Sequence, residues 1–276
     1  MTQQEQTEQY LAQRLSRFIH PRENVLLCFT HQEQGSLCAL FARVLRLIGA
    51  VPVLWGEDLR WKVLLRRAFT NRVTAVIGGC MTLAALAKMA AATGTPLRVR
   101  NALICGDTSD ARLRAAVERW LDCRVWGCCN VGDLPQVMAF TCEARLGFHL
   151  REDRYRVRIL GKSGREMPIG GSGELELTDL DDGAIYLTGD LMRTLPGTCS
   201  CGDPSLRLSR IHGVASLEDT LELHGSVLDY RVRQSEYGME LELVAFAGKP
   251  LPKLPTCARR TVRLWNPDED CPLRPE

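Results

Sequence analysis

The stretch that decides the fold reads GSGELELTDL at residues 171–180 and IYLTGDLMRTLPGTCSCG at residues 185–202. Alternating apolar and polar residues, broken by Gly and Asp, are typical of paired strands joined by tight turns. The second run ends in Cys199 and Cys201, two residues apart. This end of the stretch therefore offers two soft metal ligands from a single turn.

A second pair of soft ligands lies upstream, where Cys142 and His149 are separated by six residues. Three thiolates and one neutral imidazole are the donor set of a closed tetrahedral zinc site. We therefore expect Cys142, His149, Cys199 and Cys201 to hold a structural zinc ion that joins two distant segments of the chain. The alternative is that the cysteines are buried thiols and that His149 is a hydrogen-bonded core residue.

Asp190 lies between the strands and the second cysteine pair, in a Thr-Gly-Asp sequence. Its carboxylate is placed where a ligand-binding group would stand, close in sequence to the expected metal. Gly-Asp is also ordinary turn chemistry. Asp190 is thus a candidate binding residue, with a turn residue as the alternative.

The composition is that of a globular chain, with 276 residues, 45% hydrophobic and 25% charged side chains. This length suffices for one large domain, or for one domain and a small appendage. The formal net charge is only +2, and the arginines are scattered among acids without a basic run. We therefore expect no nucleic-acid partner.

The amino-terminal segment, MTQQEQTEQYLAQRLSRF, is polar and helical in pattern. It does not resemble an export signal, and no apolar run approaches the roughly 18 residues that a membrane span requires. We expect a cytoplasmic protein without a membrane partner. The 12 cysteines are then expected to be reduced thiols, some of them metal ligands.

The first half of the chain alternates short apolar runs with amphipathic segments. This alternation indicates a mostly parallel sheet covered by helices. In such sheets ligands gather at the carboxyl ends of the strands. The expected strands are NVLLCF (24–29), VPVLW (51–55), VTAVIGG (73–79), RNALICG (100–106) and CRVWG (123–127).

From about residue 135 the helical period disappears and short strands with Gly, Asp and Pro turns follow. We expect a small antiparallel β subdomain here, and after it a poorly patterned tail. The predicted organisation is an α/β half over residues 1–133, a β-rich subdomain over 134–228, and a short segment over 229–276.

The order of these features resembles the phenylacetate-CoA ligase branch of the adenylate-forming, AMP-dependent synthetases, over roughly residues 20–228. Such enzymes activate a carboxylate with ATP and transfer the acyl group to coenzyme A. The resemblance implies a truncated amino-terminal synthetase domain, and it supports zinc at the Cys/His positions. It is carried by residues 104–127 (ICGDTSDARLRAAVERWLDCRVWG), the Cys142/His149 segment, PIGGSGELELTDL (168–180), TGDL (188–191), CSCG (199–202) and RLSRIHG (207–213).

The resemblance also implies a nucleotide site. Gly106 and Asp107 fall in the loop that lines the adenine pocket of the family. Trp126 and Gly127 fall on its Tyr-Gly motif, where the indole could stack on adenine or serve as a core aromatic residue. Asp190 falls on the carboxylate that accepts the ribose hydroxyls.

Several positions depart from the family pattern. Asn130 stands where a Glu would help to hold magnesium, so metal–phosphate binding should weaken. Ile185 and Leu187 replace two arginines beside Asp190. The phosphate-binding loop is expected upstream of residue 1, and residues 229–276 stand where the family has the domain with its catalytic lysine.

Removal of even one preorganised donor to a transition state commonly costs roughly 100- to 1000-fold in rate. We therefore assign no catalytic residue and expect a zinc-stabilised protein that is non-catalytic or partner-dependent, with a residual pocket for ATP or AMP and an acyl or aryl carboxylate. One alternative is an active ATP-dependent acid-CoA ligase, alone or as part of a split enzyme. A third alternative is a structural interaction protein. A homo-oligomer or a partner protein would cover apolar surface that the truncation exposes.

Overall fold

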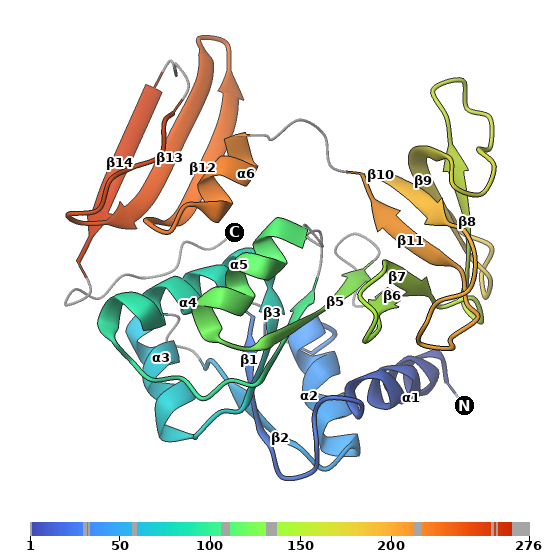
Figure 1. Cartoon of the computed structure of the whole chain (residues 1–276), viewed down its shortest axis with the longest axis horizontal. Helices are drawn as coiled ribbons and strands as arrows, with labels where there is room; N and C mark the ends of the chain where they lie inside the picture. The colour runs from blue at the N-terminus through green and yellow to red at the C-terminus, as the bar shows by residue number, and fades with distance from the viewer. Residues whose placement is uncertain are drawn as a thin grey trace.

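The structure is a computed structural model of the whole chain, shown in Figure 1. It describes residues 2–29, 32, 34–56, 60–105, 111–130, 137–211, 217–254, 257 and 259–266. Among the helices in these ranges, none combines the length and apolar composition needed to cross a bilayer.

The first half forms a parallel sheet in the strand order β2-β1-β3-β4-β5. Each expected strand of this half is present, and each of the first four strands along the chain is followed by a helix. The strands are β1 (Asn24–Cys28), β2 (Val51–Leu54), β3 (Ala75–Gly79), β4 (Asn101–Cys105) and β5 (Arg124–Asn130).

Helices cover both faces of this sheet (Figure 1). One apolar cluster joins the sheet to α1 and α2, and a second joins its other face to α3, α4 and α5. Burial of both faces explains why the central strands β1, β3 and β4 are apolar over most of their length, without polar alternation. The helices are α1 (Gln3–Leu15), α2 (Leu37–Leu47), α3 (Trp61–Thr70), α4 (Cys80–Thr93) and α5 (Ala111–Leu121).

Gly78 shows how closely the central strands approach one another. A Cβ atom at this position would lie 2.7 Å from the carbonyl oxygen of Cys28 and 2.8 Å from its Cβ atom. These distances are too short for any side chain, so only glycine fits where β3 passes β1.

The antiparallel strands of the second half continue the same sheet, which has 11 strands in the order β2-β1-β3-β4-β5-β6-β7-β11-β10-β9-β8. Because β5 pairs with β6, the two halves are joined by backbone hydrogen bonds across the expected 133/134 boundary. The division into three domains remains a prediction. The added strands are β6 (Val137–Thr141), β7 (Phe148–Leu150), β8 (Tyr155–Leu160), β9 (Ser172–Asp179), β10 (Ile185–Leu195) and β11 (Arg207–Arg210).

The carboxy-terminal segment is better ordered than its pattern suggested. Helix α6 (Leu217–Leu223) precedes a second sheet of β12 (Val227–Ser235), β13 (Gly238–Phe246) and β14 (Arg259–Trp265). Strand β14 pairs parallel to β13, whereas β12 pairs antiparallel to it. Phe246 and Trp265 pack into the apolar cluster formed by α3, α4 and α5, so this sheet shares a core with the first half.

Candidate metal centre and nucleotide site

The structure brings the four expected metal ligands together. Cys142 follows β6, His149 lies in β7, and Cys199 and Cys201 lie in the loop between β10 and β11. One ligand atom from each residue lies within 4.8 Å of every other. Three of the four residues are buried, and Cys201 is partly buried. The two distant segments that carry these residues therefore meet in one cluster.

The distances between ligand atoms fit a tetrahedral ion. The Sγ atoms of Cys142 and Cys199 are 3.6 Å apart, and the Sγ atom of Cys201 is 3.4 Å from Nε2 of His149. Neighbouring sulfurs around zinc are about 3.8 Å apart when each Zn–S bond is about 2.3 Å. A disulfide would require about 2.05 Å, and both cysteines are free thiols.

The protonation states of two residues, His149 and Cys199, suit a metal site. Burial lowers the pKa of His149, so the imidazole is neutral near pH 7 and can donate its lone pair. Burial and the neighbouring Cys199 thiol raise the pKa of Cys142 to about 11. Burial would also raise the pKa of Cys199, but hydrogen bonds from the Cys201 backbone and the Cys201 and Cys142 thiols lower it. The cluster therefore favours a thiolate at Cys199.

A set of polar residues behind His149 was missed from the sequence. The Nδ1 atom of His149 lies 3.0 Å from the Ser205 hydroxyl and 3.6 Å from a carboxylate oxygen of Asp203. Asp203 also accepts hydrogen bonds from Ser205 and pairs with Arg14 of α1 at 2.7 Å. Such partners fix the ring so that Nε2 faces the three cysteines. The turn CGDPS (201–205), directly after the last ligand, was the available signal.

The expected nucleotide residues are distributed over the sheet. Gly106 and Asp107 lie outside the described residues. Gly127 is buried within β5, and its backbone N–H donates to the Thr141 hydroxyl. Asn130 ends β5, where its buried Oδ1 atom has no hydrogen-bond partner among the described residues.

Trp126 is 3% exposed. The ring of Phe18 stacks on the indole at a centroid distance of 4.4 Å, and the guanidinium of Arg124 lies over it at 4.6 Å. Its Nε1 atom donates to Asn101 at 3.2 Å. These contacts are those of a core aromatic residue, so we do not include Trp126 in the proposed site.

Asp190 lies within β10, where the pairing with β9 shifts register between Leu187 and Leu191. Gly189 has a φ of 74°, and the Asp190 backbone N–H donates to Thr188 Oγ1. The carboxylate lies 3.5 Å from the Arg210 guanidinium on β11. In the sheet order, β6, β7 and β11 stand between β5 and β10. The Gly-Asp sequence thus forms a bulge inside a strand and does not connect two strands.

No family model matches the chain, and no curated protein sequence matches it. Solved structures do resemble it. The structure of 2-hydroxyisobutyryl-CoA ligase in the postadenylation state aligns with a TM-score of 0.67 at 16% identity, over 98% of this chain and 69% of the ligase. A benzoate CoA ligase from Burkholderia xenovorans LB400 aligns with a TM-score of 0.57 at 12% identity, over 93% of this chain and 61% of that one.

The amide bond synthetase McbA from Marinactinospora thermotolerans aligns with a TM-score of 0.56 at 16% identity, over 95% of this chain and 64% of the synthetase. Across several structures of 2-hydroxyisobutyryl-CoA ligase, the chain spans 51% to 69% of that enzyme's length. At these identities the likeness establishes the fold alone. The chain has the fold of an adenylate-forming synthetase domain.

Proposed function

We propose that the chain is a zinc-stabilised relative of the phenylacetate-CoA ligases that retains a nucleotide pocket but does not form acyl-adenylates unaided. The observation that carries this proposal lies on β10. Ile185 and Leu187, which replace two arginines of the family beside Asp190, are 63% and 65% exposed. Apolar side chains cannot stabilise the charge that develops on phosphates during adenylation.

Zinc fits the donor set of the cluster. Cys142, His149, Cys199 and Cys201 would fill all four tetrahedral positions, which leaves none open for water or substrate. The ion would therefore contribute folding free energy and would join the β6–β7 segment to the loop after β10.

Nucleotide binding would rely on Asp190 and Asn130, with Gly106 and Asp107 as further proposed contacts. Carboxylates accept hydrogen bonds from ribose hydroxyls, and the buried Oδ1 atom of Asn130 could accept one from a ligand N–H. The solved 2-hydroxyisobutyryl-CoA ligase was captured with 2-HIB-AMP and CoA. By analogy, AMP and an acyl or aryl carboxylate are the proposed ligands here.

Calorimetry with AMP and with magnesium-ATP tests this proposal. We expect AMP binding without a magnesium-dependent preference for ATP, and weaker AMP binding by Asp190→Asn. Glu236→Gln, an exposed change in the β12–β13 turn, is the matched control. The companion assay is pyrophosphate release with a panel of aryl and short-chain acids.

The outcomes separate the candidate functions. AMP binding without pyrophosphate release supports the proposal. Robust release by the isolated chain would replace it with an active ligase, and release only with added candidate partner proteins would indicate a split enzyme. Absence of binding to either nucleotide would indicate a structural interaction protein.

A further inference from the structure

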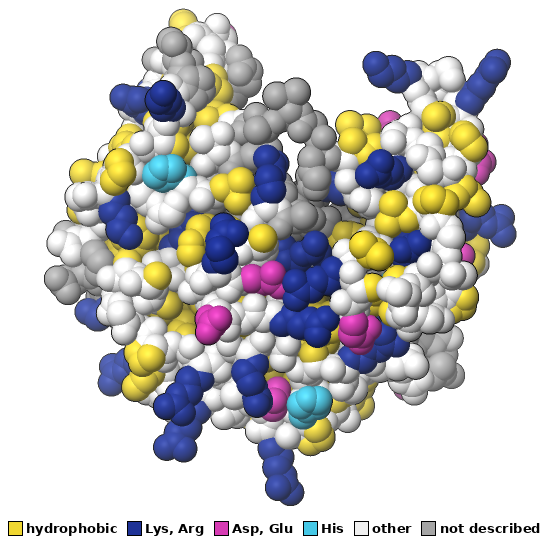
Figure 2. Space-filling model, viewed as in Figure 1, with side chains coloured by type: hydrophobic (Ala, Val, Ile, Leu, Met, Phe, Trp, Pro, Cys, Tyr) yellow, Lys and Arg dark blue, Asp and Glu magenta, His cyan; other side chains and the backbone are white. Residues whose placement is uncertain are grey.

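A shallow basic pocket of about 760 Å³ lies at the amino ends of β4 and β5. Arg100 and Arg124 precede or begin these strands, Arg119 comes from the end of α5, and Arg145 comes from the loop between β6 and β7. Figure 2 shows Lys and Arg side chains gathered near the centre of this face, where α5 and β5 lie in Figure 1. Asn130 is at the opposite end of β5, so this pocket is separate from the proposed nucleotide site.

The charges of the pocket are only partly compensated. Arg145 pairs with Glu118 at 2.6 Å, and Arg100 pairs with Glu23. Among the described residues, Arg119 and Arg124 have no carboxylate partner. Asp122 is the other acid in the lining, so four guanidinium groups face two carboxylates there.

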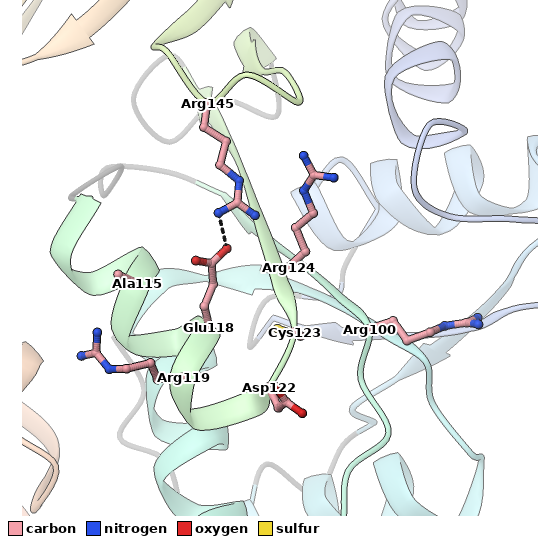
Figure 3. A pocket seen from close by; sticks show the side chains of 8 residues that line it. All are labelled: Arg100, Ala115, Glu118, Arg119, Asp122, Cys123, Arg124 and Arg145. Carbon is pink, nitrogen blue, oxygen red and sulfur yellow. Dashed lines mark ion pairs between the residues drawn. The ribbon is translucent and has the colours of Figure 1, made fainter.

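Arg124 is held in position although it is exposed. One of its terminal nitrogens donates to the Glu143 carbonyl oxygen at 3.1 Å, and its guanidinium lies over the Trp126 ring. In Figure 3 the Arg145 guanidinium reaches toward Glu118 and the Arg124 guanidinium projects beside it, while Arg119 and Arg100 project on either side. Each of the two neighbouring guanidinium groups is thus held by a partner, Arg124 by the Glu143 carbonyl and Arg145 by the Glu118 carboxylate.

One side of this pocket is formed by the loop between Cys142 and His149, two of the proposed metal ligands. This proposed metal loop carries Glu143 and Arg145. The Arg145 backbone N–H donates to the Cys142 carbonyl at 3.0 Å, and Arg145 has a φ of 56°, which few non-glycine residues adopt. The backbone conformation after Cys142, a proposed metal ligand, therefore determines the positions of the Arg145 side chain and the Glu143 carbonyl.

We propose that this pocket binds a compact phosphate-bearing anion, such as a phosphate monoester or a pyrophosphate group, between Arg124 and Arg145. Guanidinium forks match phosphate oxygens in geometry and charge, and the pocket volume falls within the range of small-ligand sites. Glu118 and Asp122 would repel an extended polyanion that ran across the pocket, which favours a small ligand over a nucleic acid.

Titration calorimetry with inorganic pyrophosphate in magnesium-free, low-salt buffer tests the site. We expect binding by the full chain and a loss of about 10-fold in affinity for each of Arg124→Gln and Arg145→Gln, because each removes charge-assisted hydrogen bonds. The Arg119 side chain has no hydrogen bond or ion pair with another described residue, so Arg119→Gln should weaken binding less, through lost charge alone. Arg165→Gln, an exposed change in the β8–β9 loop, should have no effect.

Two results would overturn the proposal: no pyrophosphate binding by the wild-type chain, or binding that Arg124→Gln and Arg145→Gln leave undiminished while circular dichroism shows them folded. A single-stranded DNA of 20 nucleotides is the comparison ligand. If it binds more tightly than pyrophosphate, and through the same arginines, the ligand of the pocket is a nucleic acid and not a compact anion. Binding at the proposed nucleotide site would instead respond to Asp190→Asn.

The link to the metal is tested separately, because it rests on the proposed function. Cys199→Ser with Cys201→Ser should weaken pyrophosphate binding if the metal positions the loop, and unchanged affinity would remove this link. A chain without zinc that still binds pyrophosphate through Arg124 and Arg145 would disprove the metal proposal and leave the anion site standing.

Discussion

At the scale of single residues, Asp203 holds the imidazole of His149, which we propose as a metal ligand. It contacts the imidazole Nδ1 atom, accepts from Ser205 and pairs with Arg14. Burial opposes its ionisation, but the Ser205 and Arg14 hydrogen bonds lower its pKa, so it is a carboxylate at neutral pH. We expect Asp203→Asn to reduce zinc affinity roughly 10- to 100-fold in a competition titration with a chromogenic chelator. Asp153→Asn, whose side chain is 67% exposed, should leave the affinity unchanged, and equal affinities in all three proteins would contradict the assignment.

The ionisation of the Cys123 thiol affects the stability of the folded chain. Burial, followed by the charges of Glu118 and Asp122, raises its pKa to about 12, whereas an unfolded thiol ionises near pH 8.5. The folded chain therefore keeps the proton that the unfolded chain loses, so stability is full below pH 8.5 and declines as the pH rises toward 12. Between pH 8.5 and 11, the melting temperature of Cys123→Ala should fall less steeply than that of the wild type. Equally steep declines in the two proteins would count against this effect.

At the scale of elements, the conformation of the proposed metal loop depends on Gly147. Its φ is 89°, and a Cβ atom there would lie 2.7 Å from the carbonyl oxygen of Leu208 and 2.6 Å from a Leu195 methyl group. Gly197 also has a positive φ, of 71°, but has open space around it. We expect Gly147→Ala to lower the melting temperature and the zinc content much more than Gly197→Ala, since only the former adds a clash with backbone to the conformational strain. Equal effects of the two changes would show that the loop tolerates the clash.

The sequence predicted the elements of the first half well, because buried parallel strands and amphipathic helices differ in period. The strands expected from the sequence did not include β7 or β14. Strand β7 spans only Phe148–Leu150, and β14 carries three arginines and a threonine among its seven residues, so neither forms a clear apolar run. The four residues of the Cys/His cluster could be singled out because Cys and His are chemically distinctive. Asp203, Ser205 and Arg14 could not, since their role depends on side-chain contacts.

At the scale of the whole molecule, the sequence could not show that the expected α/β and β-rich parts form one sheet. The pairing of β5 with β6 depends on register between segments, which residue patterns alone do not define. The carboxy-terminal sheet is similarly tied to the first half, since Phe246 and Trp265 pack with centroids 5.5 Å apart in the shared apolar cluster. We expect the described parts to unfold together.

Phe246→Ala tests this cooperation. Removal of a large buried aromatic side chain typically costs about 3–5 kcal/mol, and because the cluster is shared, the loss should shift one common urea transition. Tryptophan fluorescence and far-UV circular dichroism should report the same lowered midpoint. Two separate transitions, with only the later part of the chain destabilised, would show that the carboxy-terminal sheet folds as an independent unit.

We propose that one metal ion joins the β6–β7 segment to the loop after β10, and the proposed stability and binding of this chain depend on that ion. Elemental analysis of the purified chain, beside a Cys199→Ser, Cys201→Ser variant, tests it most directly. We predict one zinc per chain in the wild type, and loss of the metal with a lower melting temperature in the variant. A wild-type chain that is folded and free of zinc after purification and reconstitution, or a variant that keeps the full metal content, would contradict the account.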